Sequence, residues 1–280
     1  MLHTEGTFNG PRGLRMYYQV WRPDTEPRGV ILIVHGLGEH SGRYRNFVQA
    51  AAPRGYAIYA LDHIGHGKSE GTRAFVERFS DFTAPLTQFY DLVRAEQPNK
   101  PLFILGHSLG GLITSYYLLD HQDKFTGAVI SAPAVKIADN ITPTLIFVNN
   151  LVSAVLPKMG LLALDPTGIS RDPDEVAVYV NDPLNYHDKV PSRTGAEMLA
   201  AMQRVTAEAG SIRLPMLLIQ GSADKLVDPG GAPMLYEKAA SSDKTLKVYE
   251  GYYHELFNEP LPDRQKVLDD VLTWLDARTA

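Results

Sequence analysis

A serine between glycines is the strongest candidate for a chemically active residue in this sequence. The segment Gly106 to Gly110 reads G-H-S-L-G and matches the pattern G-x-S-x-G, with Ser108 at its centre. It follows the apolar run Leu102 to Leu105 and precedes a helix-like stretch. In such a turn the serine takes up a strained backbone conformation that exposes its hydroxyl, and the glycines avoid clashes with neighbouring backbone. Ser108 is therefore predicted to be a nucleophile; the alternative is a glycine-rich turn with an idle serine.

A serine hydroxyl is a poor nucleophile unless a base accepts its proton. Three histidines follow Ser108, namely His121, His187 and His254. His121 ends the helix-like stretch after the turn and so points away from the serine, and His187 lies in a segment without clear strands. His254 follows the apolar run 246–249 by a short turn, which places it at the same sheet edge as Ser108. We predict that His254 is the base.

The base needs a carboxylate to orient it, and in proteins with this turn the carboxylate precedes the histidine along the chain. Asp224 follows the apolar run 216–219 closely, and Asp228 lies shortly after it. Asp224 is favoured because it is nearer the end of a rigid strand. Asp228 is then interpreted as a turn or helix-capping carboxylate beside Pro229-Gly230.

Two backbone N–H groups are needed to stabilise the oxyanion that forms when a serine attacks a carbonyl carbon. One is the N–H of the residue after the nucleophile, which is Leu109. The second is expected in the loop His35-Gly36-Leu37-Gly38, directly after the apolar run 30–34, where Leu37 is the candidate. The alternative for His35-Gly36 is a simple turn at the end of a strand.

A second histidine-rich segment has the residue types of a metal site. Residues 62–69 read D-H-I-G-H-G-K-S and place His63 and His66 close to Asp62. No second cluster of ligands accompanies them in the sequence, and the glycines indicate a tight loop after a strand. We therefore expect a structural loop that braces the oxyanion side of the site, and no metal.

Short apolar runs alternate with longer helix-like stretches along the chain. The runs are 30–34, 56–61, 102–105, 128–130, 216–219 and 246–249, and the stretches are 81–94, 110–121, 230–240 and 265–278. Four of the runs are typical of strands buried on both faces of a parallel sheet. Residues 14–21 instead alternate apolar and polar side chains, which predicts an antiparallel strand at the sheet edge. The predicted fold class is α/β, with an open, mostly parallel sheet flanked by helices.

Composition limits the class of protein. The 280 residues are 44% apolar and 21% charged, enough for one large core or a core with an appended cap. The net charge of −5 argues against a nucleic-acid partner. The absence of cysteine excludes disulfides, thiolate zinc sites and a cysteine nucleophile, and suits a reducing cytosol. We find no signal-peptide pattern and no apolar stretch of about 18 residues that would span a bilayer.

One region interrupts the alternation of strands and helices. Between Ala132 and Pro215 no clean strand is predicted, and prolines punctuate the segment. We predict that residues 134–214 form a helical cap inserted into a core made of residues 1–133 and 215–280. Apolar residues recur in the cap at roughly helical spacing, which is typical of a buried stripe and, alternatively, of a membrane face. These residues are Ile146, Phe147, Leu151, Val152, Val155, Leu156, Leu161 and Leu162.

These segments resemble the α/β-hydrolase superfamily and, more narrowly, the monoacylglycerol lipase and lysophospholipase group of serine hydrolases. The resemblance extends over about residues 30–255, and H-G-x-G-E-H-S-G-R-Y is its most specific motif. The segments that carry it are His35 to Tyr44, Asp62 to Gly71, Gly106 to Gly111, Gly221 to Asp224 and Tyr249 to His254.

The resemblance implies particular roles for residues of this chain. It implies Ser108, Asp224 and His254 as a catalytic triad, and Leu37 and Leu109 as oxyanion donors. In this group the E-H-S-G-R-Y loop helps to bind a glycerol head group. That role carries over to Glu39 and Arg43, and His107 and Tyr179 are further polar candidates for the same pocket.

The resemblance also implies a reaction and a setting. The expected activity is hydrolysis of monoacylglycerols to fatty acid and glycerol through an acyl-enzyme, with no cofactor. The cap would cover an acyl tunnel and touch lipid surfaces, so the protein is expected in the cytoplasm with peripheral membrane contact. Alternatives are a lysophospholipase or a broad carboxylesterase, and a peptidase or thioesterase would share the triad. A non-catalytic binding protein on the same fold and a membrane-surface scaffold are alternatives of other classes.

Overall fold

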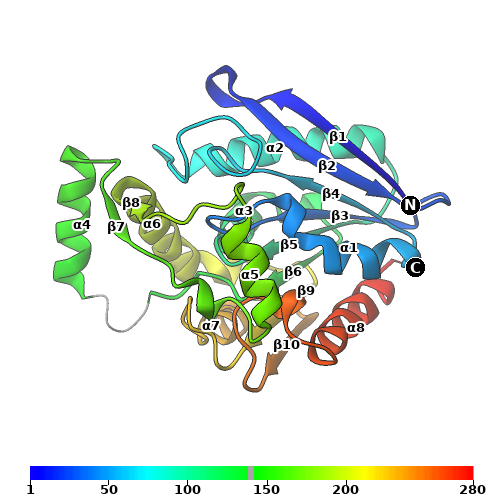
Figure 1. The fold of residues 1–280 in the computed structure, drawn as a ribbon. Coiled ribbons are helices and arrows are strands. Elements are labelled where there is room, and N and C mark those ends of the chain that lie inside the picture. The colour runs from blue at the N-terminus through cyan, green and yellow to red at the C-terminus, as the bar shows by residue number, and fades with distance from the viewer. Residues whose placement is uncertain (138–141, 280) are drawn as a thin grey trace.

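An eight-stranded sheet forms the centre of the molecule (Figure 1). The computed structural model describes residues 1–137 and 142–279, with side chains described for these residues except 143–147 and 162. The strands follow the order β1-β2-β4-β3-β5-β6-β9-β10 across the sheet. Their bounds are β1 Leu2–Asn9, β2 Arg15–Arg22, β3 Gly29–Val34, β4 Tyr56–Leu61, β5 Leu102–His107, β6 Gly127–Ser131, β9 Met216–Gly221 and β10 Lys244–Tyr249.

The sheet is parallel except at one side. Strands β4, β3, β5, β6, β9 and β10 pair in parallel, and β2 pairs antiparallel with both β1 and β4. This confirms the prediction of a mostly parallel α/β sheet. All the apolar runs that predicted parallel strands lie in strands of this sheet.

Helices cover both faces of the sheet, and the central strands bury both of their faces. Along β3, Val30, Leu32 and Val34 belong to one core layer. Ile31 and Ile33 point into the other layer, as expected from the alternation of side chains along a strand. Helices α2 Ser80–Glu96, α3 Leu109–His121 and α7 Gly231–Lys238 contribute to the first layer, and α1 Arg45–Ala51 and α8 Asp263–Asp276 to the second.

The segment between β6 and β9 adds further elements. They are α4 Pro143–Val155, β7 Gly160–Leu162, α5 Pro173–Asn181, β8 Val190–Pro191 and α6 Ser192–Glu208. Helix α6 packs against α3, with Ala201 and Val205 in the first core layer. Helix α4 packs on α6 and lies at the end of the view opposite both chain termini (Figure 1).

The structure corrects the sequence predictions at two places. The strand predicted at residues 14–21 is β2, but it does not lie at the edge, because β1 pairs along its outer side. The segment predicted to have no clean strand contains a short antiparallel pair, β7 with β8. Strand β1 has no buried apolar residue, and β7 and β8 are very short, so no local apolar pattern indicates them.

Candidate active site

Ser108 lies in a strained turn between β5 and α3. Its backbone has φ 55° and ψ −121°, a conformation that residues other than glycine rarely adopt. Glycines on either side make the turn possible. A Cβ at Gly110 would lie 1.9 Å from the backbone oxygen of Val34, and one at Gly106 would lie 2.3 Å from Thr114 Oγ1. The local sequence therefore forces the serine to the carboxyl end of β5.

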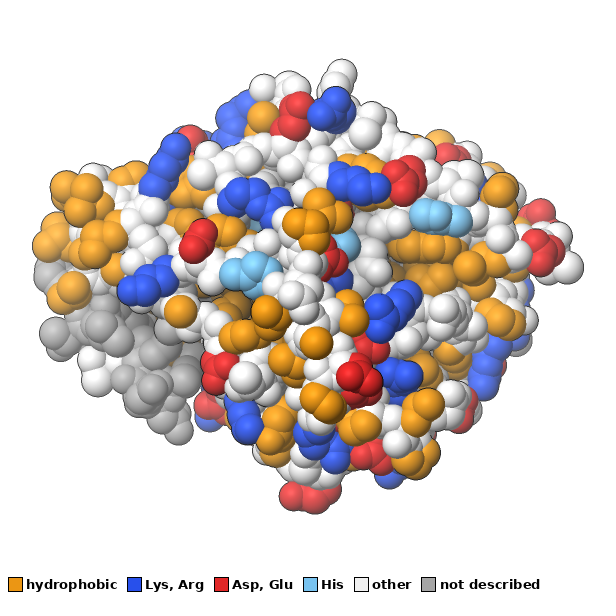
Figure 2. Space-filling model, viewed as in Figure 1, with side chains coloured by type: hydrophobic (Ala, Val, Ile, Leu, Met, Phe, Trp, Pro, Cys, Tyr) orange, Lys and Arg blue, Asp and Glu red, His pale blue; other side chains and the backbone are white. Residues whose placement is uncertain are grey.

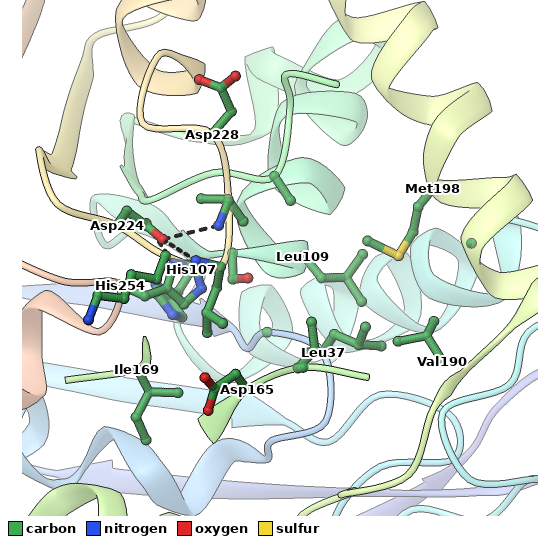
Figure 3. A pocket seen from close by; sticks show the side chains of 18 of the residues that line it. Leu37, His107, Leu109, Asp165, Ile169, Val190, Met198, Asp224, Asp228 and His254 are labelled. Atoms are coloured by element: carbon green, nitrogen blue, oxygen red, sulfur yellow. Dashed lines mark hydrogen bonds and ion pairs between the residues drawn. The ribbon is translucent and has the colours of Figure 1, made fainter. Parts of the chain in front are cut away.

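His254 and Asp224 come from loops that follow neighbouring strands, β10 and β9. The Nδ1 of His254 lies 2.8 Å from Oδ2 of Asp224, and the two side chains point toward one another in Figure 3. The other carboxylate oxygen, Oδ1, accepts the backbone N–H groups of Leu226 and Val227 at 2.9 and 3.0 Å. The carboxylate is therefore held on both sides and can fix the orientation of the imidazole.

The competing candidates have other partners. Asp228 forms an ion pair with Lys136 at 2.8 Å and accepts the N–H of Gly230, so it acts as a turn carboxylate. His121 packs against the ring of Tyr117 at the far end of α3, and His187 is exposed. Asp224, and not Asp228, therefore contacts His254.

Burial and the ion pair act in opposite directions on the two titrating groups. Burial favours the neutral imidazole, but Asp224, together with Glu255 and Glu39, outweighs it and raises the pKa of His254 above its ordinary value. Burial likewise opposes ionisation of Asp224, but His254 and the backbone donors hold its pKa below the usual range. The carboxylate is therefore ionised at neutral pH and favours a protonated imidazole.

Leu37 and Leu109 line the same cavity as Ser108, and the two leucine side chains lie near one another in Figure 3. Leu109 is the first residue of α3, where backbone N–H groups have no partner within the helix. Within residues 1–137 and 142–279, neither the Leu37 N–H nor the Leu109 N–H has a hydrogen-bond acceptor. Two backbone donors of this kind can bind an oxyanion.

A cavity of about 830 Å³ opens over Ser108 and His254. Its wall contains side chains from the loop after β3, from α5 and α6, and from the loops after β9 and β10. Met198 and Val190 lie further along it from the histidine in Figure 3. The apolar side chains of this part are Ile137, Leu161, Leu164, Val190, Met198, Leu199 and Met202. A cavity of this size and lining can hold an acyl chain.

Polar groups line the cavity near the histidine. Glu39, His107 and Tyr179 are buried there. The His107 ring lies against that of His254, with 4.6 Å between centroids, and burial together with His254 lowers the pKa of His107 to about 3. Arg43 is placed differently, because its guanidinium binds Glu255 and lines a separate small void. The structure thus brings three of the four predicted head-group residues to the cavity.

The loop after β4 ties together the backbone around the site. Asp62 accepts the N–H and the hydroxyl of Ser41 at 2.8 and 2.6 Å, and the N–H of Lys68 at 2.8 Å. His63 donates its backbone N–H to Nε2 of His35 at 2.9 Å, in the loop that is predicted to carry an oxyanion donor. These bonds agree with a bracing role for the loop. Residues 1–137 and 142–279 contain no cluster of three or more metal-ligating side chains.

Glu255 is a residue of the site that the sequence analysis missed. It is buried, it follows His254 directly, and it lines the cavity. Its partner Arg43 lies 212 residues away in the chain, so no spacing rule could have paired them. The only available signal was a carboxylate adjacent to the predicted base.

The fold and the site together define a class of protein. A mostly parallel sheet carries a serine at a strand-to-helix turn, with a histidine–aspartate pair after later strands, as in α/β-hydrolases. Residues 25–261 match the family model described as "Serine aminopeptidase, S33". The chain belongs to this hydrolase family.

Comparisons with individual proteins show a more specific similarity, to monoacylglycerol lipases. The chain is 37% identical to a monoacylglycerol lipase of Mycolicibacterium smegmatis, covering 97% of this chain and 96% of the relative. It is 36% identical to the human monoglyceride lipase, covering 96% and 89% of the two chains. The crystal structure of the Paleococcus ferrophilus monoacylglycerol lipase superposes with a TM-score of 0.83 at 30% identity, covering 99% of this chain and all of that one.

Proposed function

We propose that this protein hydrolyses monoacylglycerols to fatty acid and glycerol. The observation that carries the proposal is the His254–Asp224 hydrogen bond beside Ser108 in a cavity of about 830 Å³. The similarity to monoacylglycerol lipases over nearly the whole chain supports the choice of substrate. The family model is described by a peptidase activity, but the apolar length of the cavity favours a lipid ester over a peptide.

In the proposed reaction His254 accepts the hydroxyl proton as Ser108 Oγ attacks the acyl carbonyl carbon. Asp224 orients the imidazole and stabilises the imidazolium. The Leu37 and Leu109 N–H groups bind the oxyanion. His254 then gives the proton to the glycerol oxygen, which leaves, and the acyl group stays on Ser108. Water attacks this ester through the same steps and releases the fatty acid, so no cofactor is required.

The polar end of the cavity is proposed to hold the glycerol. Glu39, His107 and Tyr179 offer acceptors and donors for its hydroxyl groups. Burial raises the pKa of Glu39 despite the nearby Arg43. A negatively charged phosphate head group would be repelled by Glu39, which disfavours lysophospholipids.

We also propose that residues 134–214 act as a cap that touches membrane. Figure 2 shows hydrophobic side chains gathered at the end of the molecule where α4 lies. Among the described cap residues Leu151, Val155 and Leu156 are 59%, 71% and 54% exposed. Ile146, Phe147 and Leu162, predicted for the same apolar stripe, lie outside the described side chains. No helix of the described residues is long and apolar enough to cross a bilayer, and we propose a cytoplasmic protein with peripheral contact.

The membrane contact is tested by vesicle binding. Leu151→Asp combined with Val155→Asp is expected to weaken binding to phosphatidylcholine vesicles about tenfold or more, since each burial of an apolar side chain contributes about 1.5–3 kcal/mol. Val248→Asp is the matched control, because Val248 is 50% exposed on β10. Equal binding by the double variant and the control would contradict the contact.

The activity is tested by fatty-acid release from monoacylglycerol, diacylglycerol, triacylglycerol and lysophosphatidylcholine with one acyl chain. Monoacylglycerol is expected to be preferred, and Ser108→Ala is expected to abolish release. Equal rates on all esters would retain the triad and favour a broad carboxylesterase. No release from any substrate, together with no labelling of Ser108 by a fluorophosphonate, would favour a binding protein on a hydrolase fold.

A further inference from the structure

A buried arginine joins two loops of the proposed active site. Arg43 lies in the loop after β3, shortly after Leu37, and Glu255 directly follows His254. The Arg43 Nη2 donates to Glu255 Oε2 at 2.8 Å, and Nη1 donates to Oε1 of the same carboxylate. The two side chains are only 4% and 7% exposed. We infer that Arg43 and Glu255 are positioning residues that fix the spacing between His254 and the oxyanion donor at Leu37; the inference rests on the proposed function.

The contacts of Arg43 extend to the oxyanion loop through Glu39. The Arg43 Nη1 lies 3.7 Å from Glu39 Oε2. The other oxygen of Glu39 accepts the Gly36 N–H at 2.6 Å and the hydroxyl of Tyr44 at 2.9 Å. Because Gly36 directly precedes Leu37, the carboxylate holds the backbone from which the proposed oxyanion donor projects.

The contacts of Glu255 hold the histidine loop in the same way. Its backbone N–H donates to the carbonyl oxygen of Ile169 at 2.7 Å. Its Oε2 also accepts from Asn258 Nδ2 at 2.9 Å. Glu255 is therefore fixed through both backbone and side chain, and a shift of its carboxylate would move the adjoining His254.

The surroundings of Arg43 favour a positioning role over contact with a glycerol head group. Arg43 lines a void of about 10 Å³, which is about enough for one water and too small for glycerol. The ring of Tyr179 covers the guanidinium of Arg43, whose Cζ lies 4.6 Å from the ring centroid. A cation between an aromatic ring and two carboxylates has little surface left for a substrate.

The geometry of the ion pair explains why arginine is needed. A guanidinium donates two parallel hydrogen bonds to one carboxylate, whereas a lysine ammonium is a point charge without this fixed orientation. Loss of the pair would let the two loops shift independently. A displacement of about 1 Å between catalytic groups can lower turnover about 10²-fold.

The inference is tested with two substrates that share one acyl chain, a monoacylglycerol and a p-nitrophenyl ester without glycerol. Arg43→Met is expected to lower kcat about 10²-fold on both substrates, with KM nearly unchanged. Arg43→Lys is expected to recover part of this loss, because it restores the charge but not the two parallel bonds. A loss confined to the glycerol ester, or seen in KM alone, would assign Arg43 to the head group and overturn the inference.

A second ion pair provides the matched control. Glu175 has a side chain only 7% exposed, binds Arg45 and Arg264 at 2.7 and 3.2 Å, and is not among the described residues that line the cavity. Glu175→Gln is expected to lower the thermal midpoint as Glu255→Gln does, but to retain kcat. If Arg43→Met does not fold, Glu255→Gln provides the test, because it retains the shape of the side chain.

Labelling by a fluorophosphonate separates failure of the inference from failure of the proposed function. Wild-type protein that does not label at Ser108 would refute the proposed function and, with it, the inference. If the wild-type protein labels at Ser108 and folded Glu255→Gln labels at the same rate, the inference alone is refuted. Slower labelling of Glu255→Gln than of Glu175→Gln is the expected result.

Discussion

Replacement of Asp224 by asparagine is predicted to abolish ester hydrolysis in a protein that remains folded. The Oδ1 of Asp224 accepts two backbone N–H groups, from Leu226 and Val227, while Oδ2 faces Nδ1 of His254 at 2.8 Å. An asparagine amide has one oxygen, and the two backbone donors require it at the Oδ1 position. Its NH2 group then faces the imidazole.

The reversed donor would place the imidazole in the wrong tautomer. His254 Nδ1 must then accept a hydrogen bond, so the ring proton moves to Nε2, the atom that has to receive the Ser108 proton in the proposed mechanism. The surroundings tolerate the exchange. Gln220 Nε2 donates to Asp224 Oδ2 at 3.0 Å, and Gln220 Oε1 is buried without a partner among the described residues. A rotation of the Gln220 amide would let it accept from the new NH2 group.

A wrong tautomer of this kind lowers kcat about 10⁴-fold in serine hydrolases, which corresponds to about 5 kcal/mol of activation free energy. The assay is the initial rate of fatty-acid release, with urea unfolding to show that the variant is folded. Asp228→Asn is the control, since Asp228 binds Lys136 instead of His254. Retention of about a tenth of wild-type kcat by folded Asp224→Asn, or an equal loss in Asp228→Asn, would refute the reasoning.

Three further predictions concern pH and stability. The raised pKa of His254 predicts that kcat/KM on a neutral ester falls as pH decreases through a value above 6.5, because only the neutral imidazole accepts a proton; an acid limb well below 6.5 would contradict it. Gly110→Ala is expected to lower the free energy of unfolding by about 3 kcal/mol, because its Cβ would lie 1.9 Å from a backbone oxygen. A Cβ at Gly195, in α6, would have no neighbour closer than 4.0 Å, so Gly195→Ala should instead raise the free energy of unfolding by about 1 kcal/mol. Urea unfolding measures both variants. Burial lowers the pKa of His63 to about 3 and of His66 to about 4, so the unfolded chain binds more protons below pH 6.5. Stability is therefore expected to fall on acidification, by about 1.4 kcal/mol per group and pH unit, and urea midpoints that do not change between pH 7 and 5 would exclude this.

The strands that the sequence predicted differ in burial from β1, one of the strands that it did not predict. Residues of β3, β4 and β5 are all buried, so their sequences are continuous apolar runs that stand out without any partner. Strand β1 has no fully buried residue: Thr4, Gly6 and Phe8 on one face are half-buried and the others are exposed. Its pairing with β2 holds it in the sheet. Its sequence, L-H-T-E-G-T-F-N, has no apolar run, so only the hydrogen bonds to another segment define it as a strand.

The segment between β6 and β9 was the least predictable part of the fold for the same reason. The pair β7 and β8 forms between Gly160–Leu162 and Val190–Pro191, too short for a periodic pattern to indicate. Helix α6 lies within the predicted cap but packs on α3, with Val205 fully buried in the first core layer. Local periodicity predicts that a helix has an apolar side, but not which layer covers it.

The features of this protein that depend on local chemistry could be predicted from the amino-acid sequence. G-H-S-L-G after an apolar run required the turn at Ser108, since nearby backbone leaves no room for larger side chains at Gly106 and Gly110. The order of serine, aspartate and histidine along the chain followed from the order of the strands.

The contacts between residues far apart in the chain depend on the three-dimensional fold. It directs Asp224 rather than Asp228 toward the histidine. It joins Arg43 to Glu255, and both side chains are buried. Such pairings depend on how loops from different strands meet at one edge of the sheet, a long-range property that no local spacing of residues encodes.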